Sequence, residues 1–450
     1  MRLDLDEIQG DITPGFRKDH QDFVFLFFDR AAEARQWLVK LHPVLSSARQ
    51  VIENNRGHRA WMKDYGYRES APEKPDEPPP PLTRCVNVAF SYRGLQRLEV
   101  RDLGGFPTEF VADPLTRAER LGDEDSFETW QIGGPDSEPD ALLILGADTR
   151  ADLDALRDEH EVEWKRYRMR AICESGATLG GGIEHFGFRD GLSQPDPNEP
   201  TEDGWTASAD GQIAAPGEFI LGQPNALGST YVVGPEWARN GSYAVFRKLE
   251  QHVYLFRETM DKEATRLGMS PEALAAKLVG RRKDGIRLDS LGEGCPLFAH
   301  IQKANPRDRP EVEPNRHRII RRGIAYGSPA KHRNAEAHDD GARGLLFLAY
   351  QASIRNQFEY ILTQWMNDST FPPPRAASGF RPSAVPSLVE IPGWDPLVGR
   401  FRGSDTLQVP LFNGRAIDVL ELPEFVTTRG GAYFFSPSIS AVRRLAARAC

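Results

Sequence analysis

The chain has 450 residues, of which 40% are hydrophobic and 27% are charged. This composition is typical of a globular protein and excludes the disordered and membrane-spanning classes, and the length allows two domains. The net charge of −9 argues against nucleic acid or an anionic membrane surface as a partner, because both favour clustered Lys and Arg. Apolar runs such as residues 23–28 are strand-sized, far below the roughly 20 residues of a spanning helix.

The N-terminal sequence MRLDLDEIQGDITPGF has none of the basic, apolar and twin-arginine features of an export signal, so we expect a cytoplasmic protein. The four cysteines, Cys85, Cys173, Cys295 and Cys450, are isolated from one another. They form no Cys-x-x-Cys pair for zinc, iron–sulfur or dithiol chemistry, and no Cys-x-x-Cys-His sequence for covalent haem attachment.

Five segments share one order, in which an apolar strand is followed by an amphipathic helix. They are residues 21–47, 140–164, 242–267, 344–366 and 431–448. Short strands joined by such helices, with long irregular insertions, predict an α+β fold with two halves. Each half is expected to be an antiparallel sheet with helices on one face.

Three irregular tracts separate these units. The Pro-rich stretch 71–82 predicts an exposed loop, because its prolines lack N–H donors. The Gly- and Pro-rich tract 190–219 predicts the junction of the halves, which gives domains of residues 1–219 and 220–450. The third tract, 366–396, is expected to wrap over the second half, since long loops are usually packed or functional.

A Gly-x-x-Asp-Gly motif at residues 187–191 places Asp190 between two glycines. On its own the pattern is compatible with an ordinary glycine-flanked Asx-turn. In its functional interpretation, the glycines let the backbone approach a flat cofactor while the Asp190 carboxylate acts over it as a buried acid/base.

His300 follows an apolar run in CPLFAHIQKANPR. Neutral imidazole is the commonest metal ligand, but a lone histidine is more often a core or surface residue, and His185 beside the glycine motif is a competing candidate. In HRIIRRGIAYG, strand alternation sends Arg321 and Arg322 to opposite faces, which would bury one and leave the other solvated.

Taken together and in this order, the motifs resemble those of the dye-decolourising peroxidases. The resemblance covers nearly the whole chain and is greatest to the larger bacterial and fungal branches. It rests on EIQGDITPGFRKDHQDFVFLFF, FGFRDGLSQP, CPLFAHIQKANPR, IIRRGIAYG, GLLFLAYQASIRNQFEYILTQWMN and VTTRGGAYFFSPSISAVRRL. It implies two ferredoxin-like halves of the dimeric α+β-barrel type. It also implies one non-covalent haem b per chain, bound mainly by the second half and roofed by the glycine motif.

The resemblance also implies roles for individual residues. Asp190 would be the distal acid/base, His300 the axial ligand of the haem iron, and Arg321, rather than its neighbour, the group that stabilises charge as the O–O bond of peroxide breaks. Leu345 and Phe347 share a strand face, and they would either line the apolar wall of the haem pocket or belong to the ordinary core.

These assignments predict a peroxidase that uses hydrogen peroxide to oxidise an aromatic dye or phenol in one-electron steps, and a homo-oligomer is compatible with the sequence. A haem carrier or sensor of the same fold would keep His300 without needing both Asp190 and Arg321, so their joint presence favours the enzyme. A haem-free binding protein is a third alternative. Some relatives have an Asp where this chain has Ser353, so the sequence leaves the hydrogen-bond partner of His300 unassigned.

Overall fold

The computed structural model describes residues 3–65, 81–197, 214–230, 232–291, 294–307, 309–330, 341–373, 391–400, 406–412 and 417–447. Most of the predicted loop 71–82 lies outside the described residues, as do the middle parts of the tracts 190–219 and 366–396. In the part of the chain that is described, no helix combines the length and apolarity needed to cross a bilayer.

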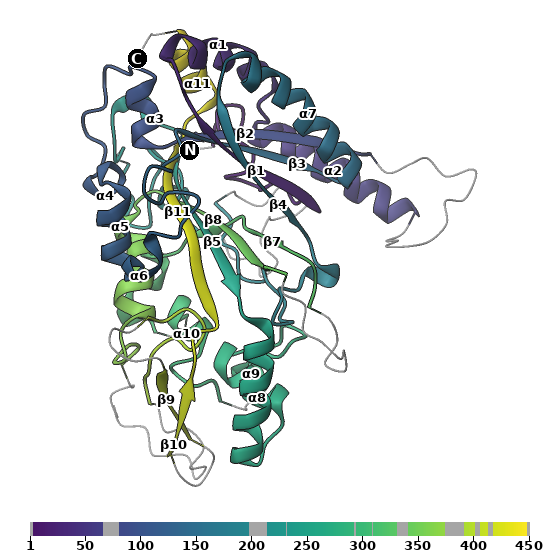
Figure 1. The fold of residues 1–450 in the computed structure, drawn as a ribbon, viewed down its shortest axis with the longest axis vertical. Helices are drawn as coiled ribbons and strands as arrows, with labels where there is room; N and C mark the ends of the chain where they lie inside the picture. The colour runs from purple at the N-terminus through teal and green to yellow at the C-terminus, as the bar shows by residue number, and fades with distance from the viewer. Residues whose placement is uncertain are drawn as a thin grey trace.

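An antiparallel sheet organises the molecule, with the strand order β4-β1-β3-β2-β11-β5-β8-β6 and with β7 also paired to β8 (Figure 1). Its strands are β1 (His20–Phe27), β2 (Arg84–Phe90), β3 (Ala141–Ala147), β4 (Arg170–Ala177), β5 (Ser242–Gln251), β6 (Ile320–Arg321), β7 (Ile324–Tyr326), β8 (Gly344–Gln351) and β11 (Val426–Ser436). A separate two-stranded sheet contains β9 (Leu407–Phe412) and β10 (Ile417–Leu422).

The helices follow the predicted strand–helix order. Those of the first half are α1 (Ala31–Leu41), α2 (Ala48–Tyr65), α3 (Tyr92–Arg97), α4 (Thr108–Val111), α5 (Pro114–Leu121), α6 (Glu124–Phe127) and α7 (Arg150–Arg166). Those of the second half are α8 (Val253–Leu267), α9 (Pro271–Val279), α10 (His300–Ala304) and α11 (Ile439–Ala447), together with the π-helical turns η8 (Arg355–Glu359) and η9 (Ile361–Met366). The α+β fold expected from the sequence is confirmed.

The two faces of the sheet carry different cores, because successive strand residues point in opposite directions. In β1, Phe23 and Phe25 belong to an inner core, where the Phe25 ring lies 4.7 Å from that of Phe246. Val24 and Leu26 belong to an outer core that α1, α7 and α11 cover (Figure 1). Full burial of each such side chain stabilises the fold by about 1.5–3 kcal/mol.

The two halves of the sheet meet where β2 lies beside β11. At this seam Phe90 of β2 pairs with Phe435 of β11, and β11 pairs along its length with β5. Gln9 of the N-terminal segment reinforces the seam, since its Nε2 donates to the Val88 carbonyl at 2.8 Å and to Ser436 Oγ at 3.0 Å. The strand β11, from near the C-terminal end of the described chain, therefore lies between β2 of the first half and β5 of the second.

The two edges of the sheet approach each other, so the sheet coils toward a barrel. At the contact between β4 and β7, a Cβ added to Gly176 would lie 2.3 Å from Ile324 Cγ2, so this close approach requires glycine. Lys248 of β5 and Glu174 of β4 form an ion pair at 2.6 Å nearby. The inner core is the interior of this barrel.

Candidate active site

The Gly-x-x-Asp-Gly motif forms a tight loop that presents Asp190. Gly187 donates its N–H to the Glu184 carbonyl at 2.8 Å, and Glu184 donates to the Phe188 carbonyl at 2.9 Å. Gly187 and Gly191 have φ angles of 93° and 73°, in the left-handed region that favours glycine. The motif therefore needs its glycines for the backbone turn that carries the carboxylate.

Asp190 meets Arg321 from the second half of the chain. Arg321 Nη1 lies 2.6 Å from Asp190 Oδ1, which also accepts the N–H of Gly191 at 2.6 Å. A second contact fixes the strand to the motif, since Gln194 Oε1 accepts the Arg321 N–H at 3.0 Å. The glycine motif and β6 are thus joined at two points.

The environment of Asp190 keeps its carboxylate ionised. Enclosure by the protein raises the pKa of Asp190, but the charge of Arg321, the hydrogen bonds from Gly191 and Arg321 and the charge of His300 lower it, and the outcome is a pKa below 3.8. The side chains of Asp190 and Arg321 remain 40% and 33% exposed. A small molecule can therefore reach a carboxylate that is charged above its lowered pKa.

Arg322 points elsewhere, as strand alternation predicts. Its Nε donates to the Asp11 carbonyl at 2.8 Å and its Nη2 to the Ile12 carbonyl at 3.0 Å. Burial lowers the pKa of Arg322 to about 10 despite the opposing charge of Asp11. Arg322 thus anchors the N-terminal segment, whereas Arg321 faces Asp190.

His300 begins α10 and pairs with a carboxylate that the sequence left unidentified. The His300 Nδ1 lies 2.8 Å from Asp395 Oδ2, and the Asp395 side chain is fully buried. Asp395 Oδ1 accepts the N–H groups of Leu397 at 2.9 Å and Val398 at 3.0 Å. Burial raises the pKa of Asp395, but the charge and hydrogen bond of His300 and the two N–H groups lower it below 3.8.

This pairing leaves His300 with one nitrogen suited to a metal. Because an ionised carboxylate only accepts hydrogen bonds, Nδ1 carries a proton, and Nε2 is the nitrogen that could bind a metal once its own proton is released. Burial lowers the pKa of His300, but the charge and hydrogen bond of Asp395 outweigh that effect and raise it. The imidazole is 29% exposed, and the charges of Arg321 and Asp190 both act on it. Among the described residues no cluster of three or more His, Cys, Asp and Glu side chains could hold a metal ion. A single imidazole on which the charges of a partly exposed acid and arginine act fits a haem, whose macrocycle would supply further iron ligands.

Leu345 and Phe347 lie on β8 with side chains that are partly exposed, whereas their neighbours Leu346 and Leu348 are fully buried in the inner core. The face that Leu345 and Phe347 share also carries Ala349, which is in register with Arg321. Both residues therefore lie on the strand face from which Arg321 projects, and Phe347 also packs on the outer core.

His185, the competing ligand, is engaged in a different way. Its side chain is 5% exposed, and its Nε2 lies 2.8 Å from the Tyr326 carbonyl, which accepts the proton. His185 thus fastens the loop before Asp190 to β7. His300, in contrast, has the buried carboxylate partner that is typical of metal-binding histidines.

Asp395 is the site residue that sequence reasoning missed. It lies in Gly-Trp-Asp-Pro-Leu, at the end of the tract predicted to wrap over the second half. The signal available was an Asp followed by Pro, a pattern typical of a side chain that accepts from the next backbone N–H groups. The Ser353 Oγ accepts the Asn356 N–H at 3.2 Å, close to the start of η8.

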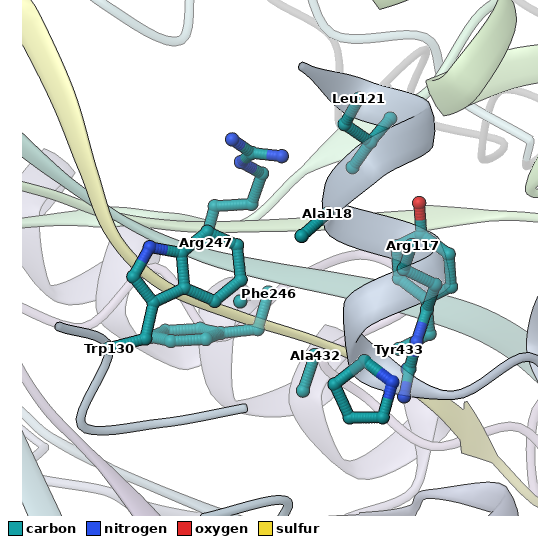
Figure 2. Close-up of a pocket in the computed structure, with 10 residues that line it drawn as sticks. Arg117, Ala118, Leu121, Trp130, Phe246, Arg247, Ala432 and Tyr433 are labelled. Atoms are coloured by element: carbon teal, nitrogen blue, oxygen red, sulfur yellow. The ribbon is translucent and has the colours of Figure 1, made fainter. Parts of the chain in front are cut away.

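A cavity of about 20 Å³ lies away from these residues, between α5 and the strands β5 and β11. Figure 2 shows Arg117, Trp130 and Tyr433 among its lining side chains. Its size suits about one water molecule. None of Asp190, His300 and Arg321 lines this cavity.

Two family models match consecutive parts of the chain. The family model described as the DyP dimeric alpha+beta barrel domain matches residues 7–173, and the one described as the Dyp-type peroxidase C-terminal domain matches residues 183–371. The chain is 32% identical to the multifunctional dye peroxidase DyP2 of Amycolatopsis sp., over 98% of this chain and 96% of the relative. It is 30% identical to the dye-decolorizing peroxidase msp1 of Mycetinis scorodonius, over 98% of this chain and 87% of that protein.

Two solved structures match nearly the whole chain. A fungal DyP-type peroxidase from Auricularia auricula-judae matches with a TM-score of 0.75 and 27% identity, over 99% of this chain and 100% of that one. An ancestral D-type dye-decolorizing peroxidase matches with a TM-score of 0.78 and 28% identity, over 98% and 99% of the two chains.

Proposed function

The chain belongs to the dye-decolourising peroxidase family, and from that premise we propose that it is a haem b peroxidase. Its substrates would be hydrogen peroxide and an aromatic dye or phenol that gives up electrons one at a time. The observation that supports this proposal is the 2.6 Å contact between Asp190 Oδ1 and Arg321 Nη1, two groups whose charges also act on His300.

His300 would hold the iron through Nε2, with Asp395 fixing the ring orientation through Nδ1. The bound haem supplies the oxidising chemistry, while the protein supplies orientation, charge and protons. The chain has no Cys-x-x-Cys-His sequence, so attachment would be non-covalent. Leu345 and Phe347 would give the cofactor an apolar wall.

Asp190 would move the proton. Its Oδ1 is held by Arg321 and by the Gly191 N–H, while Oδ2 has no hydrogen-bond partner among the described residues. Oδ2 could therefore take a proton from one oxygen of hydrogen peroxide and deliver it to the other. A pKa below 3.8 keeps this base ionised in mildly acidic solution.

Arg321 would have two tasks. Its guanidinium would offer a positive charge to the oxygen that becomes negative as the O–O bond breaks. The same charge lowers the pKa of Asp190. Arg321 would thereby keep the Asp190 carboxylate ionised and also stabilise the negative oxygen that forms in the reaction.

Stopped-flow mixing of the haem-loaded protein with hydrogen peroxide, followed by dye turnover, tests the proposal. The expected result is a fast spectral change in the wild-type protein and a slow one in Asp190→Asn at equal haem content. A protein that binds haem stoichiometrically but does not turn over dye with peroxide would be a carrier or sensor. A protein that shows no Soret band after haem reconstitution would overturn the haem assignment.

A further inference from the structure

The carboxylate of Glu184, six residues before Asp190, is a group that the proposed chemistry does not use. Its Oε2 accepts the Phe186 N–H at 2.9 Å, and its Oε1 accepts the Phe188 N–H at 2.9 Å. Hydrogen bonds to an ionised acceptor are stronger than those between neutral groups. The Glu184 side chain therefore folds the next residues of the Gly-x-x-Asp-Gly loop around itself.

A third hydrogen bond ties this carboxylate to the central sheet. Gln251 Nε2 donates to Glu184 Oε2 at 2.6 Å. Gln251 is the last residue of β5 and is 6% exposed, and its own backbone N–H donates to the Arg343 carbonyl at 2.8 Å. Because this end of the strand is held in place, its bond to Glu184 holds the loop in place as well.

Three N–H donors thus converge on the two oxygens of Glu184. An ionised carboxylate only accepts hydrogen bonds, so it can satisfy all three donors at once. Glutamine has nearly the same shape, but its NH2 group would face at least one of these donors. The conformation of the loop therefore depends on a carboxylate at this position.

The loop that Glu184 holds leads directly to Asp190. The Asp190 N–H donates to the Gly182 carbonyl at 3.0 Å, and the Glu184 N–H donates to the Phe188 carbonyl at 2.9 Å. The segment 182–190 is therefore a narrow loop closed at its base, and a change inside it displaces Asp190. A displacement of about 1 Å can slow a catalysed reaction by about 10²-fold.

We propose that Glu184 is a positioning residue that fastens the Gly-x-x-Asp-Gly loop to β5, so that the Asp190 carboxylate stays in contact with Arg321. The inference rests on the proposed function, since it gives the loop a part in the reaction with peroxide. It predicts that the rate of this reaction depends on the hydrogen bonds of Glu184. The alternative is that Glu184 contributes to stability alone.

Stopped-flow mixing of the haem-loaded full chain with hydrogen peroxide tests the proposal. Glu184→Gln should slow the reaction by about 10–10²-fold at equal haem content, because Asp190 is displaced. Glu7→Gln is the matched control: Glu7 Oε2 accepts the Ser440 N–H at 3.1 Å and joins the N-terminal segment to α11. This control should keep the wild-type rate. A wild-type rate in Glu184→Gln, or an equal loss in both variants, would overturn the proposal.

The Asp190→Asn background separates positioning from stability. If Glu184 acts through Asp190, Glu184→Gln should have little further effect on the peroxide rate in that background, because coupled residues give non-additive double-mutant cycles. A loss of the same size in both backgrounds would mean that Glu184 acts on the protein as a whole, and would overturn the proposal. If Glu184→Gln does not fold, Gln251→Met, which removes only the bond to β5, takes its place.

Hydrogen–deuterium exchange of the haem-free full chain distinguishes this inference from the proposed function. Backbone amides of the segment 183–191 should exchange faster in Glu184→Gln than in the wild type, and at the wild-type rate in Glu7→Gln. Unchanged exchange in Glu184→Gln would overturn the role of Glu184, whatever the protein binds. Faster exchange in a chain that shows no Soret band after haem reconstitution would support the anchoring of the loop and overturn the haem peroxidase proposal instead.

Discussion

The Asp190–Arg321 pair joins the two halves of the chain and stays 40% and 33% exposed, whereas the His300–Asp395 pair lies within the second half with its carboxylate fully buried. The first pair is held by a glycine-flanked turn and a short strand. The second is held by two backbone N–H groups and a helix start. A group that exchanges protons with a small molecule must be reachable, while a group that fixes a ligand must not move.

Removal of the His300 imidazole, from the His300–Asp395 pair, should have the largest effect on the protein, which is the loss of haem binding. We expect His300→Ala to lose stoichiometric haem binding or to keep a weakly held haem with an altered Soret band, because nothing covalent retains the cofactor. The pyridine haemochrome assay and the absorption spectrum measure this. His185→Ala is the control and should keep the wild-type spectrum. The opposite pattern would transfer the axial role to His185.

Removal of the exposed pair's base should spare haem binding and reduce the reaction with peroxide. Asp190→Asn keeps the size of the side chain and an acceptor for Arg321, but it cannot take a proton. The expected loss is about 10²–10⁴-fold, the usual contribution of general acid–base catalysis. Stopped-flow rates with hydrogen peroxide at matched haem content measure it. A loss below about threefold would remove Asp190 from the proton relay.

Arg321 and Arg322 are neighbours in the sequence, but Arg321 is partly exposed and Arg322 is buried, so the two should have different roles. Arg321→Leu should slow the reaction with peroxide by about 10²–10³-fold, as for the loss of one charge-stabilising donor. Arg322→Leu should instead lower the free energy of unfolding by about 1–3 kcal/mol for each backbone carbonyl that it leaves without a donor. Urea unfolding and stopped-flow rates on both variants separate the effects. Equal kinetic losses would mean that both arginines serve the chemistry.

Sequence reasoning located the residues of the exposed pair because each lies in a local pattern. The turn around Asp190 is specified by Gly187 and Gly191, and the alternation of β6 separates Arg321 from Arg322. The five strand–helix units likewise depend on periodicities within short windows. In the fourth unit, residues 344–366, the strand is present as β8, but the helix has π-helical turns, which hydrophobic spacing alone does not distinguish.

What the sequence left open depends on contacts between distant segments. Asp395 is 95 residues from His300, and it reaches the imidazole only because the chain returns across the second half. β11 likewise enters the sheet between β2 and β5, an insertion that no local window encodes. Such pairings are fixed by the packing of both sheet faces, which a pattern of single residues does not specify.

The smallest expected effect is a shift in the pH dependence of the reaction with peroxide. It tests whether Arg321 lowers the pKa of Asp190. In the wild type the pKa of Asp190 lies below 3.8, so the base stays ionised as the pH falls and the reaction with peroxide should fail only below that pKa. Dye oxidation should accordingly be fastest at about pH 3–5, near the range in which a carboxylate exchanges protons.

Arg321→Leu removes the largest contribution that lowers this pKa, while the enclosure that raises it remains. The pKa of Asp190 should therefore rise, and the acidic limb of the residual peroxide rate should move to higher pH. Because only the ionised carboxylate can act as the base, the residual activity would be lost earlier on acidification than in the wild type. Peroxide rates measured from acidic to neutral pH in both proteins give the two limbs. An acidic limb at the same pH in both would mean that it reports another group than Asp190.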